Sequence, residues 1–462
     1  FQGRPLSLMV DQQARIAYIE NEPVDKLGDI FSELRVLTEY DYFWFWNDAE
    51  SRVVVYRTYG EKKRFIFNQS LNRSNDYEAG KRNKLSNLDG SVKTLRKLFD
   101  IKEVVDRFYK QLWEIRLELA RSYEIPDEGS ISDQQRLLLA QKNIDRIIFI
   151  YFLIEQDIIH VLDDVGTRIS AGPELVFETL SDQSEPIEDI LDEIFFERLN
   201  SENEDEYFVS KDQGLYVPYL NGGLFNEQSY EIKKGNTISE RDIDRDDFDW
   251  NSLFDQLSDY RWLIPQPTDD KSEDDERNEL TPAVLGHMYE KFVITVSELS
   301  DDDQLTLEEL SDLEVTDSGR LLLGNRRVGA YYTPSYITDE NARSILWNRT
   351  LEKLSEQTDR KLDNLPNSFS EYFSQIRRNN AEIDTETVSN IIGNLTILDP
   401  GVGSGAFPMA AGSVLEDWLL KLGDVDTLYD VRRDIVTSNL YGVDLLEGAT
   451  DVCRLRLWLW LV

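Results

Sequence analysis

The chain has 462 residues, of which 40% are hydrophobic and 11% aromatic. This is enough for two to four folded domains and excludes an intrinsically disordered tail. No uninterrupted apolar run reaches the roughly 18 residues that a membrane span needs. The one cysteine, Cys453, excludes an internal disulfide and a cysteine metal site. We therefore expect a cytoplasmic protein with no membrane partner.

The formal charge of −39 comes from 89 acidic and 50 basic residues. An acidic chain at first suggests a protein that does not bind DNA, because phosphate contacts need Lys and Arg. The acids, however, are dispersed along the whole chain, which favours a halophilic, salt-adapted surface. With that interpretation the net charge does not decide whether DNA is a partner.

Residues 4–75 predict a small β-containing N-terminal element. Tyr42–Trp46 and Val53–Tyr56 form a hairpin pattern rich in strand-forming residues, and Arg64–Phe67 predicts a third strand. The aromatic side chains of this hairpin suit either a hydrophobic core or stacking on nucleic acid, and the core is the commoner use.

Residues 90–320 predict a helical domain. Apolar residues recur at spacings of three and four from Leu95 to about Tyr123. A second helical region runs from Ser132 to His160 and is apolar on most sides, as expected of a core helix. Further helices are predicted over residues 173–180 and 187–199. Another begins near Leu280, with Thr281 as N-cap and a proline in its first turn.

Residues 325–462 predict an α/β region. After a helix through Ile345 and Trp347, the order is helix, helix, strand, glycine loop, helix, helix, strand, helix. The predicted fold class is therefore mixed α and α/β.

The glycine loop is the strongest functional signal. Asp399 ends an apolar run, Leu395–Leu398, which predicts a buried strand. Gly401, Gly403 and Gly405 let backbone N–H groups approach a ligand without interference from a Cβ atom. Ala406 then opens a helix, whose N-terminus favours a negative group. A plain strand-to-helix turn is the alternative interpretation.

The spacing argues against two common nucleotide sites. A dinucleotide site needs G-x-G-x-x-G and an acid about 20 residues further on. Here the pattern is G-x-G-x-G, and the next strand-ending acid, Asp444, follows Gly405 by 39 residues. A P-loop needs Gly-Lys-Ser/Thr, which does not occur. An acid directly before the glycines would repel a pyrophosphate but suits an amine, such as that of a methionine moiety.

Three segments in this order resemble the motifs of DNA adenine-N6 methyltransferases. They are Gly329–Pro334 (Gly-Ala-Tyr-Tyr-Thr-Pro), Asp399–Phe407 (Asp-Pro-Gly-Val-Gly-Ser-Gly-Ala-Phe), and Tyr441–Asp444 with the helix that follows it. Two upstream segments, Pro218–Phe225 and Leu280–Glu290, resemble the helical connector of large single-chain methyltransferases of the type IIG restriction–modification and BREX phage-defence kind. The resemblance covers about residues 90–462.

The resemblance implies S-adenosylmethionine as cofactor, double-stranded DNA as partner, other defence-system proteins as further partners, and a first half of a Rossmann-like class I methyltransferase domain at 325–462. It implies that Asp399 holds the methionine part, that Asp444 accepts the ribose hydroxyls, and that Tyr332 helps to close over the methionine end. The implied cofactor contacts are Tyr331, Tyr332, Thr333, Pro334, Asp399, Pro400, Gly401, Gly403, Ser404, Gly405, Phe407, Asp444 and Leu445.

One departure from the family is large. The family methylates with an (Asn/Asp/Ser)-Pro-Pro-aromatic tetrapeptide that holds the flipped base. No Pro-Pro occurs in this sequence, so we expect no catalytic residue in the chain. We expect instead that the motif lies beyond Val462 and that the chain is the N-terminal portion of a longer protein. The reaction needs no metal.

Two other functions are kept as alternatives. One is a non-catalytic scaffold that binds DNA or partners in a defence complex. The other is an added N-terminal nuclease, with Glu61-Lys62-Lys63 and Asp41 or Asp48 holding Mg²⁺; a solvated hairpin end is the simpler interpretation of that spelling. His160 and His287 are expected to be structural or exposed, and two histidines without cysteine partners do not predict a zinc site.

Overall fold

The fold was analysed in a computed structural model of the chain. The residues that the structure describes are 7–10, 15–20, 27–37, 41–47, 52–58, 64–68, 84–88, 95, 97–99, 102–126, 130–162, 167–169, 172, 176–177, 186–200, 207–209, 214–220, 223–233, 235–245, 247–262, 279–298, 306–308, 333–358, 361–362, 365–423 and 427–462.

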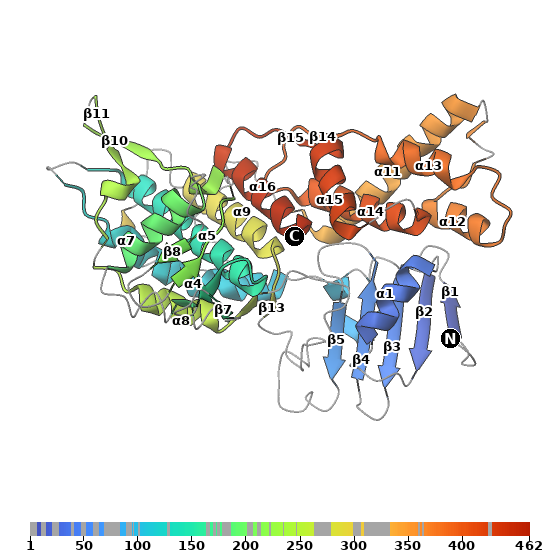
Figure 1. Ribbon diagram of the computed structural model, residues 1–462, viewed down its shortest axis with the longest axis horizontal. Helices are drawn as coiled ribbons and strands as arrows, with labels where there is room; N and C mark the ends of the chain where they lie inside the picture. Colours follow the sequence, from blue (N-terminus) through green and yellow to red (C-terminus); the bar gives the residue numbers. More distant parts are fainter. Residues whose placement is uncertain are drawn as a thin grey trace.

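The N-terminal region is one five-stranded sheet with strand order β1-β2-β3-β4-β5 (Figure 1). Its strands are β1 (Ser7–Val10), β2 (Arg15–Glu20), β3 (Tyr42–Asn47), β4 (Arg52–Arg57) and β5 (Arg64–Asn68). The predicted hairpin and third strand are confirmed as β3, β4 and β5, which pair antiparallel. The sequence analysis did not identify β1, β2 or the helix α1 (Leu27–Leu37). This helix connects β2 to its parallel neighbour β3.

Both faces of this sheet are covered. Alternate residues of β3 and β4 point to opposite sides, as the period of a strand requires. One face, with Tyr42 and Val55, packs on Leu95 and Phe99, and the other packs on α1. Tyr56 is buried, and Trp44 and Trp46 are half-buried against the first face. The hairpin aromatics are therefore core residues.

The central region is a helical body with small sheets at its edge. Its helices are η2 (Lys97–Phe99), α4 (Lys102–Ser122), α5 (Asp133–Glu155), α7 (Ile187–Asp192), the π-helical η3 (Glu193–Arg198), η4 (Gly223–Phe225), η5 (Glu240–Asp242), α8 (Trp250–Ser258) and α9 (Ala283–Glu298). Its strands are β6 (His160–Leu162), β7 (Arg168–Ile169), β8 (Tyr207–Val209), β9 (Gly214–Tyr216), β10 (Ser229–Lys233), β11 (Asn236–Ser239), β12 (Arg261–Trp262) and β13 (Glu279–Leu280).

The long core helix α5 starts where the sequence predicts and ends earlier. Ser132 caps it through a capping box with Gln135. The helix stops at Glu155 because Asp157 takes a left-handed backbone conformation, with φ 58°. The placement of His160 at a helix end was therefore wrong: His160 lies in β6, buried, with its ring stacked on Tyr216 at 4.8 Å.

The start of α9 also differs from its prediction in one detail. The helix begins at Ala283, directly after Pro282, and the Val284 N–H bonds to the Thr281 carbonyl at 2.8 Å. The Thr281 hydroxyl is buried and makes no hydrogen bond to a described residue, so it does not cap the helix. Predicted residues 173–180 lie mostly outside the described part of the chain.

The C-terminal region has the predicted order of elements. They are α11 (Ser335–Thr358), α12 (Phe369–Arg377), α13 (Thr385–Gly393), β14 (Ile397–Asp399), α14 (Ala406–Leu422), α15 (Leu428–Asp434), the π-helical η8 (Ile435–Asn439), β15 (Leu440–Gly442) and α16 (Glu447–Leu461). The prediction of a buried strand before Asp399 was wrong, because Leu398 is 62% exposed. Among described residues β14 pairs only with β15, and the neighbouring Tyr441 of β15 is also exposed.

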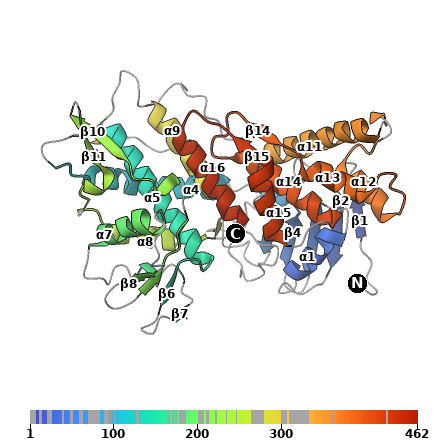
Figure 2. The same ribbon diagram turned by 45° about the horizontal axis from the view of Figure 1, so that its top comes forward.

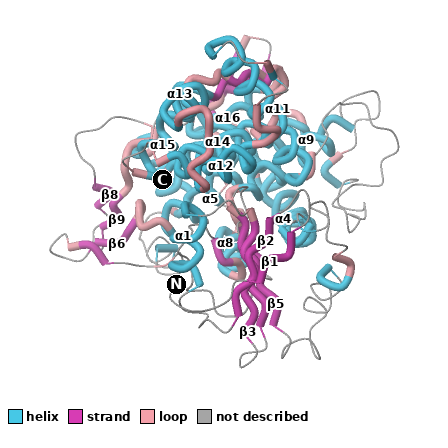
Figure 3. The backbone as a smooth tube through the Cα atoms, turned by 90° about the vertical axis from the view of Figure 1, so that its right-hand side faces the viewer, coloured by secondary structure: helices cyan, strands magenta, loops and turns pink. Residues whose placement is uncertain are grey.

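The three regions contact one another through α16 and buried ion pairs. Helix α16 lies between the helical body and the C-terminal helices (Figure 2), and its Leu455 and Leu459 belong to the hydrophobic core of the body. The N-terminal sheet lies beside the C-terminal helices (Figures 1 and 3) and is tied to them by Arg57–Asp339 at 2.9 Å. Across the described ranges, no helix combines the length and the apolar character that crossing a membrane requires.

Candidate functional site

The ends of two parallel strands define the candidate site. Strands β14 and β15 pair in register, with Asp399 opposite Gly442. Beyond the strands the pairing continues: Val443 N–H donates to the Asp399 carbonyl and Val402 N–H donates to the Val443 carbonyl, both at 2.9 Å. These bonds bring Asp399, the glycine loop and Asp444 to one edge, where open α/β sheets bind ligands.

Asp444 holds the loop in place. Its Oδ2 accepts the N–H of Gly403 at 2.8 Å, and its Oδ1 accepts the N–H of Leu446 at 2.9 Å. A carboxylate oxygen has two lone pairs, so each of these oxygens can still accept one more hydrogen bond. The carboxylate is thus positioned by the backbone and keeps the capacity to bind hydroxyl groups.

Asp399 offers the second carboxylate. Its Oδ1 accepts the N–H of Gly401 at 3.1 Å, while its Oδ2 is buried and has no hydrogen-bond partner among the described residues. No atom lies within 4 Å of where a Cβ would stand at Gly401 or Gly403. Buried polar atoms are seldom left without a partner, and a ligand that donates a hydrogen bond would satisfy Asp399 Oδ2.

Gly405 is required by its backbone and by its neighbour. It precedes α14 with φ 90°, in the left-handed region that favours glycine. A Cβ at this position would lie 2.7 Å from the sulfur of Cys453, on α16. Burial raises the pKa of that thiol to about 11, which keeps it protonated and apolar in this contact.

Ser404 joins the loop to two other helices. Its hydroxyl donates to Glu290 Oε1, on α9, at 2.6 Å. Arg456, on α16, donates from Nη1 to the Ser404 carbonyl at 2.7 Å and lies 3.3 Å from the Ser404 hydroxyl oxygen. Gly286 of α9 lies against the same arginine, so closely that a Cβ at this position would overlap Arg456 Nη1. The helical body therefore reaches the glycine loop directly.

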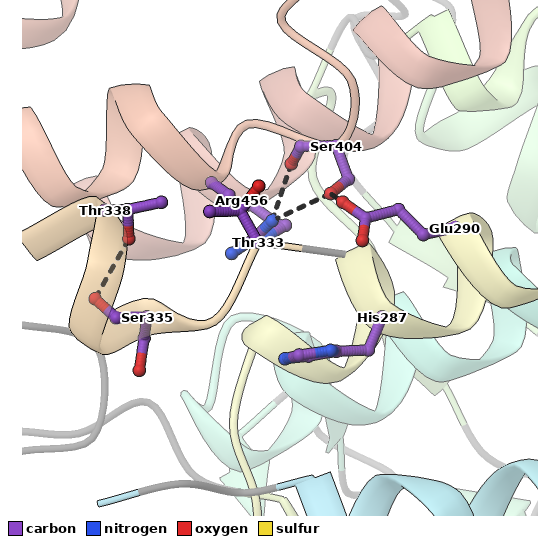
Figure 4. A pocket seen from close by; sticks show the side chains of 8 residues that line it. His287, Glu290, Thr333, Ser335, Thr338, Ser404 and Arg456 are labelled. Carbon is purple, nitrogen blue, oxygen red and sulfur yellow. Dashed lines mark hydrogen bonds between the residues drawn. The ribbon is translucent and has the colours of Figure 1, made fainter. Parts of the chain in front are cut away.

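A small polar pocket, partly open to solvent, lies beside Ser404 (Figure 4). Helix α9 contributes His287 and Glu290 to its lining. The start of α11 contributes hydroxyl groups, with those of Thr333 and Thr338 among them, and α16 contributes Arg456. Figure 4 shows His287 and Glu290 extending from α9 toward the side where Thr333 and Ser404 lie.

The structure brings together part of the predicted set. Thr333 and Ser404 share the pocket, and Pro334 starts α11 by accepting the Ile337 N–H at 2.8 Å. Leu445 is fully exposed and Phe407 is 39% exposed, so Phe407 is not a core residue. Pro400 is also exposed, whereas Tyr331 and Tyr332 lie outside the described residues.

Two functional candidates escaped the sequence analysis. Glu290 ends the segment Leu280–Glu290 and Arg456 lies in the helix after Asp444, and no role was predicted for either; His287 was expected to be structural or exposed. The available signals were an acid, Glu290, and a glycine, Gly286, in the apolar part of α9, where a glycine costs stability and so indicates close packing. The partners of these residues come from distant segments, which only the fold brings together.

The nuclease residues gain no support from the described part of the chain. The Asp41 carboxylate is buried and accepts from Arg343 Nη2 with both oxygens, at 3.0 and 3.2 Å. Asp48 and Glu61–Lys63 lie outside the described residues.

Comparison with known proteins finds a relative that aligns with most of this chain. The chain is 27% identical over 367 residues to a protein of Methanocaldococcus jannaschii named "Putative type II restriction enzyme and methyltransferase". The aligned part is 73% of this chain and 26% of the relative, so the chain matches about a quarter of that protein's length. No family model and no solved structure matches the chain.

Proposed function

We propose that this chain is the cofactor-binding part of a DNA methyltransferase. The enzyme would transfer a methyl group from S-adenosylmethionine to adenine N6 in duplex DNA, within a restriction–modification or phage-defence system. The observation that carries the proposal is the pair of carboxylates, Asp399 and Asp444, at the ends of adjacent parallel strands on either side of the glycine loop. The relative named as a restriction enzyme and methyltransferase supports the same class.

The residues of the loop fit this cofactor. Asp444 would accept the ribose hydroxyls on the lone pairs that the backbone leaves available, and the buried Asp399 Oδ2 would accept a hydrogen bond from the methionine part. Tyr441, Val443 and Leu445 are exposed, and we propose that these side chains would cover the adenine ring. We propose that this region is the first half of a Rossmann-like domain.

The cofactor would supply an activated methyl group on a sulfonium. The chain's own residues would bind and orient it, since positioning alone accounts for a large part of such a rate enhancement. No Pro-Pro occurs in the 462 residues, so we assign no residue of this chain to hold the target base.

Cofactor binding tests this proposal. Calorimetry with S-adenosylhomocysteine should detect binding to the full-length protein, and Asp444→Ala should weaken it at least about 10-fold, because a charged acceptor for the ribose is lost. Asp434→Ala, an exposed acid that pairs with Arg433 on the surface, is the matched control and should bind as the wild type does.

Absence of binding by the wild type, or unchanged binding by Asp444→Ala, would overturn the proposal and leave the non-catalytic scaffold as the better hypothesis. Methylation of DNA by the full-length protein, with the modified base identified by mass spectrometry, tests the choice of adenine N6.

A further inference from the structure

The helical body contributes a wall to the cofactor site through α9. At Gly286 this helix approaches Arg456 and Ser404 so closely that a Cβ would overlap Arg456 Nη1 and lie 2.9 Å from Ser404 Oγ. Helix α9 therefore packs directly on the side chains of Arg456 and of Ser404 in the glycine loop. Side chains one turn further along α9 are therefore held beside the loop.

Glu290 is that side chain, four residues after Gly286. Its Oε1 accepts the Ser404 hydroxyl at 2.6 Å, a short bond as expected of a charged acceptor. Because the Ser404 hydroxyl donates its only proton to Glu290, it can accept a hydrogen bond from a cofactor but cannot donate one. The negative charge of Glu290, rather than the serine, is then what a positive ligand group meets at this wall.

The pocket has the chemistry of an amino-acid binding site. Glu290 is the carboxylate among the described residues that line it, Arg456 provides a positive charge, and Thr333 and Thr338 provide hydroxyls (Figure 4). A ligand with an ammonium and a carboxylate attached to the same carbon can pair with both Glu290 and Arg456, whereas a neutral or singly charged ligand leaves at least one of them without an opposite charge. S-adenosylmethionine ends in a zwitterion of this kind.

We propose that Glu290 accepts a hydrogen bond from the ammonium group at the amino-acid end of the cofactor, so that the helical body supplies part of the cofactor site. This inference rests on the proposed function. Glu290 would share this ammonium, the only hydrogen-bond donor in the methionine part, with Asp399, which is not among the residues that line this pocket. An ammonium has three donors, and one carboxylate does not satisfy them.

Two ligands that differ at one end test the proposal. S-adenosylhomocysteine has the ammonium, and methylthioadenosine lacks the whole amino-acid end. In the full-length protein, Glu290→Gln keeps an oxygen acceptor for Ser404 and removes the charge. It should weaken the binding of S-adenosylhomocysteine about 10- to 100-fold, which is the range for loss of a hydrogen bond to a charged group. The affinity for methylthioadenosine should change by less than about 2-fold.

The matched control is Glu352→Gln, an exposed residue of α11 that pairs with Arg349, which should leave both affinities unchanged. If Glu290→Gln unfolds at the wild-type temperature, an equal change in affinity for the two ligands, or no change, would overturn the role of Glu290. If the wild type binds neither ligand, the proposed function fails instead.

If Glu290→Gln also loses the binding of methylthioadenosine and unfolds at a lower temperature than the wild type, the variant Glu290→Asp is used in its place. Aspartate keeps the negative charge, but its side chain is one methylene shorter, so the carboxylate lies further from the ligand. Selective weakening of S-adenosylhomocysteine then supports the proposal, and equal weakening of both ligands overturns it.

Discussion

The two sheets at opposite ends of the chain come from similar apolar runs and are covered very differently. In the N-terminal sheet, Phe43 of β3 is fully buried and packs edge-on against Phe31 of α1 at 5.5 Å. In the C-terminal pair, Leu398 is 62% and Tyr441 50% exposed. The alternation of a strand fixes which residues share a face, and only the neighbouring elements fix whether that face is dry.

The comparison also separates stability from binding. The N-terminal sheet is enclosed by two hydrophobic clusters, and its strand ends carry no candidate site among the described residues. The β14–β15 pair leaves its carboxyl edge and apolar side chains accessible, which is where the candidate site lies. An incompletely covered sheet is a poor core and a suitable place for a ligand.

The largest expected effect is the loss of stability when a large side chain is removed from the N-terminal sheet, compared with the same change in the β14–β15 pair. Phe43→Ala should lower the free energy of unfolding by about 3–5 kcal/mol, because it empties a core position. Leu398→Ala should change it by less than about 0.5 kcal/mol, because this side chain is already exposed. Urea unfolding of the two variants measures the difference. A large cost at Leu398 would mean that its face is covered in solution.

A second prediction concerns how the two ends are joined. Asp339→Asn, on α11, should cost about 3 kcal/mol, because it leaves the buried Arg57 guanidinium without its paired charge. Glu352→Gln, in an exposed pair on the same helix, should cost less than about 1 kcal/mol. Thermal unfolding monitored separately in the sheet and in α11, by amide exchange, compares them. Equal effects would contradict a buried inter-region clamp.

The smallest expected effect is the pH response of Cys453, beside Gly405. Its pKa of about 11 is raised from 9.0 by burial, so between these values the folded chain keeps a proton that the unfolded chain has lost. This contribution to stability is complete below pH 9 and is lost as the pH rises through about 11. Cys453→Ala should flatten that part of the stability profile. A native thiol alkylated as fast as free cysteine at pH 8.5 would contradict the burial.

The local sequence determined most elements and the centre of the candidate site. Strand-forming residues gave β3, β4 and β5, and apolar spacing gave α4 and most of α5. Asp399, the alternating glycines and Asp444 followed from their own chemistry and order, because the motif is contiguous and the acid ends an apolar strand. These features depend on neighbours within a few residues, so a single sequence contains them.

Tertiary structure alone decided the rest. The end of α5 depends on a left-handed residue, Asp157, whose conformation the apolar pattern does not encode. The exposure of β14 depends on what packs against it. Glu290 and Arg456 contact Ser404 across 114 and 52 residues of sequence, and these contacts exist only after the chain has folded. The sequence by itself determined the order of the elements and the contiguous glycine motif, and long-range packing decided which distant side chains lie beside that motif.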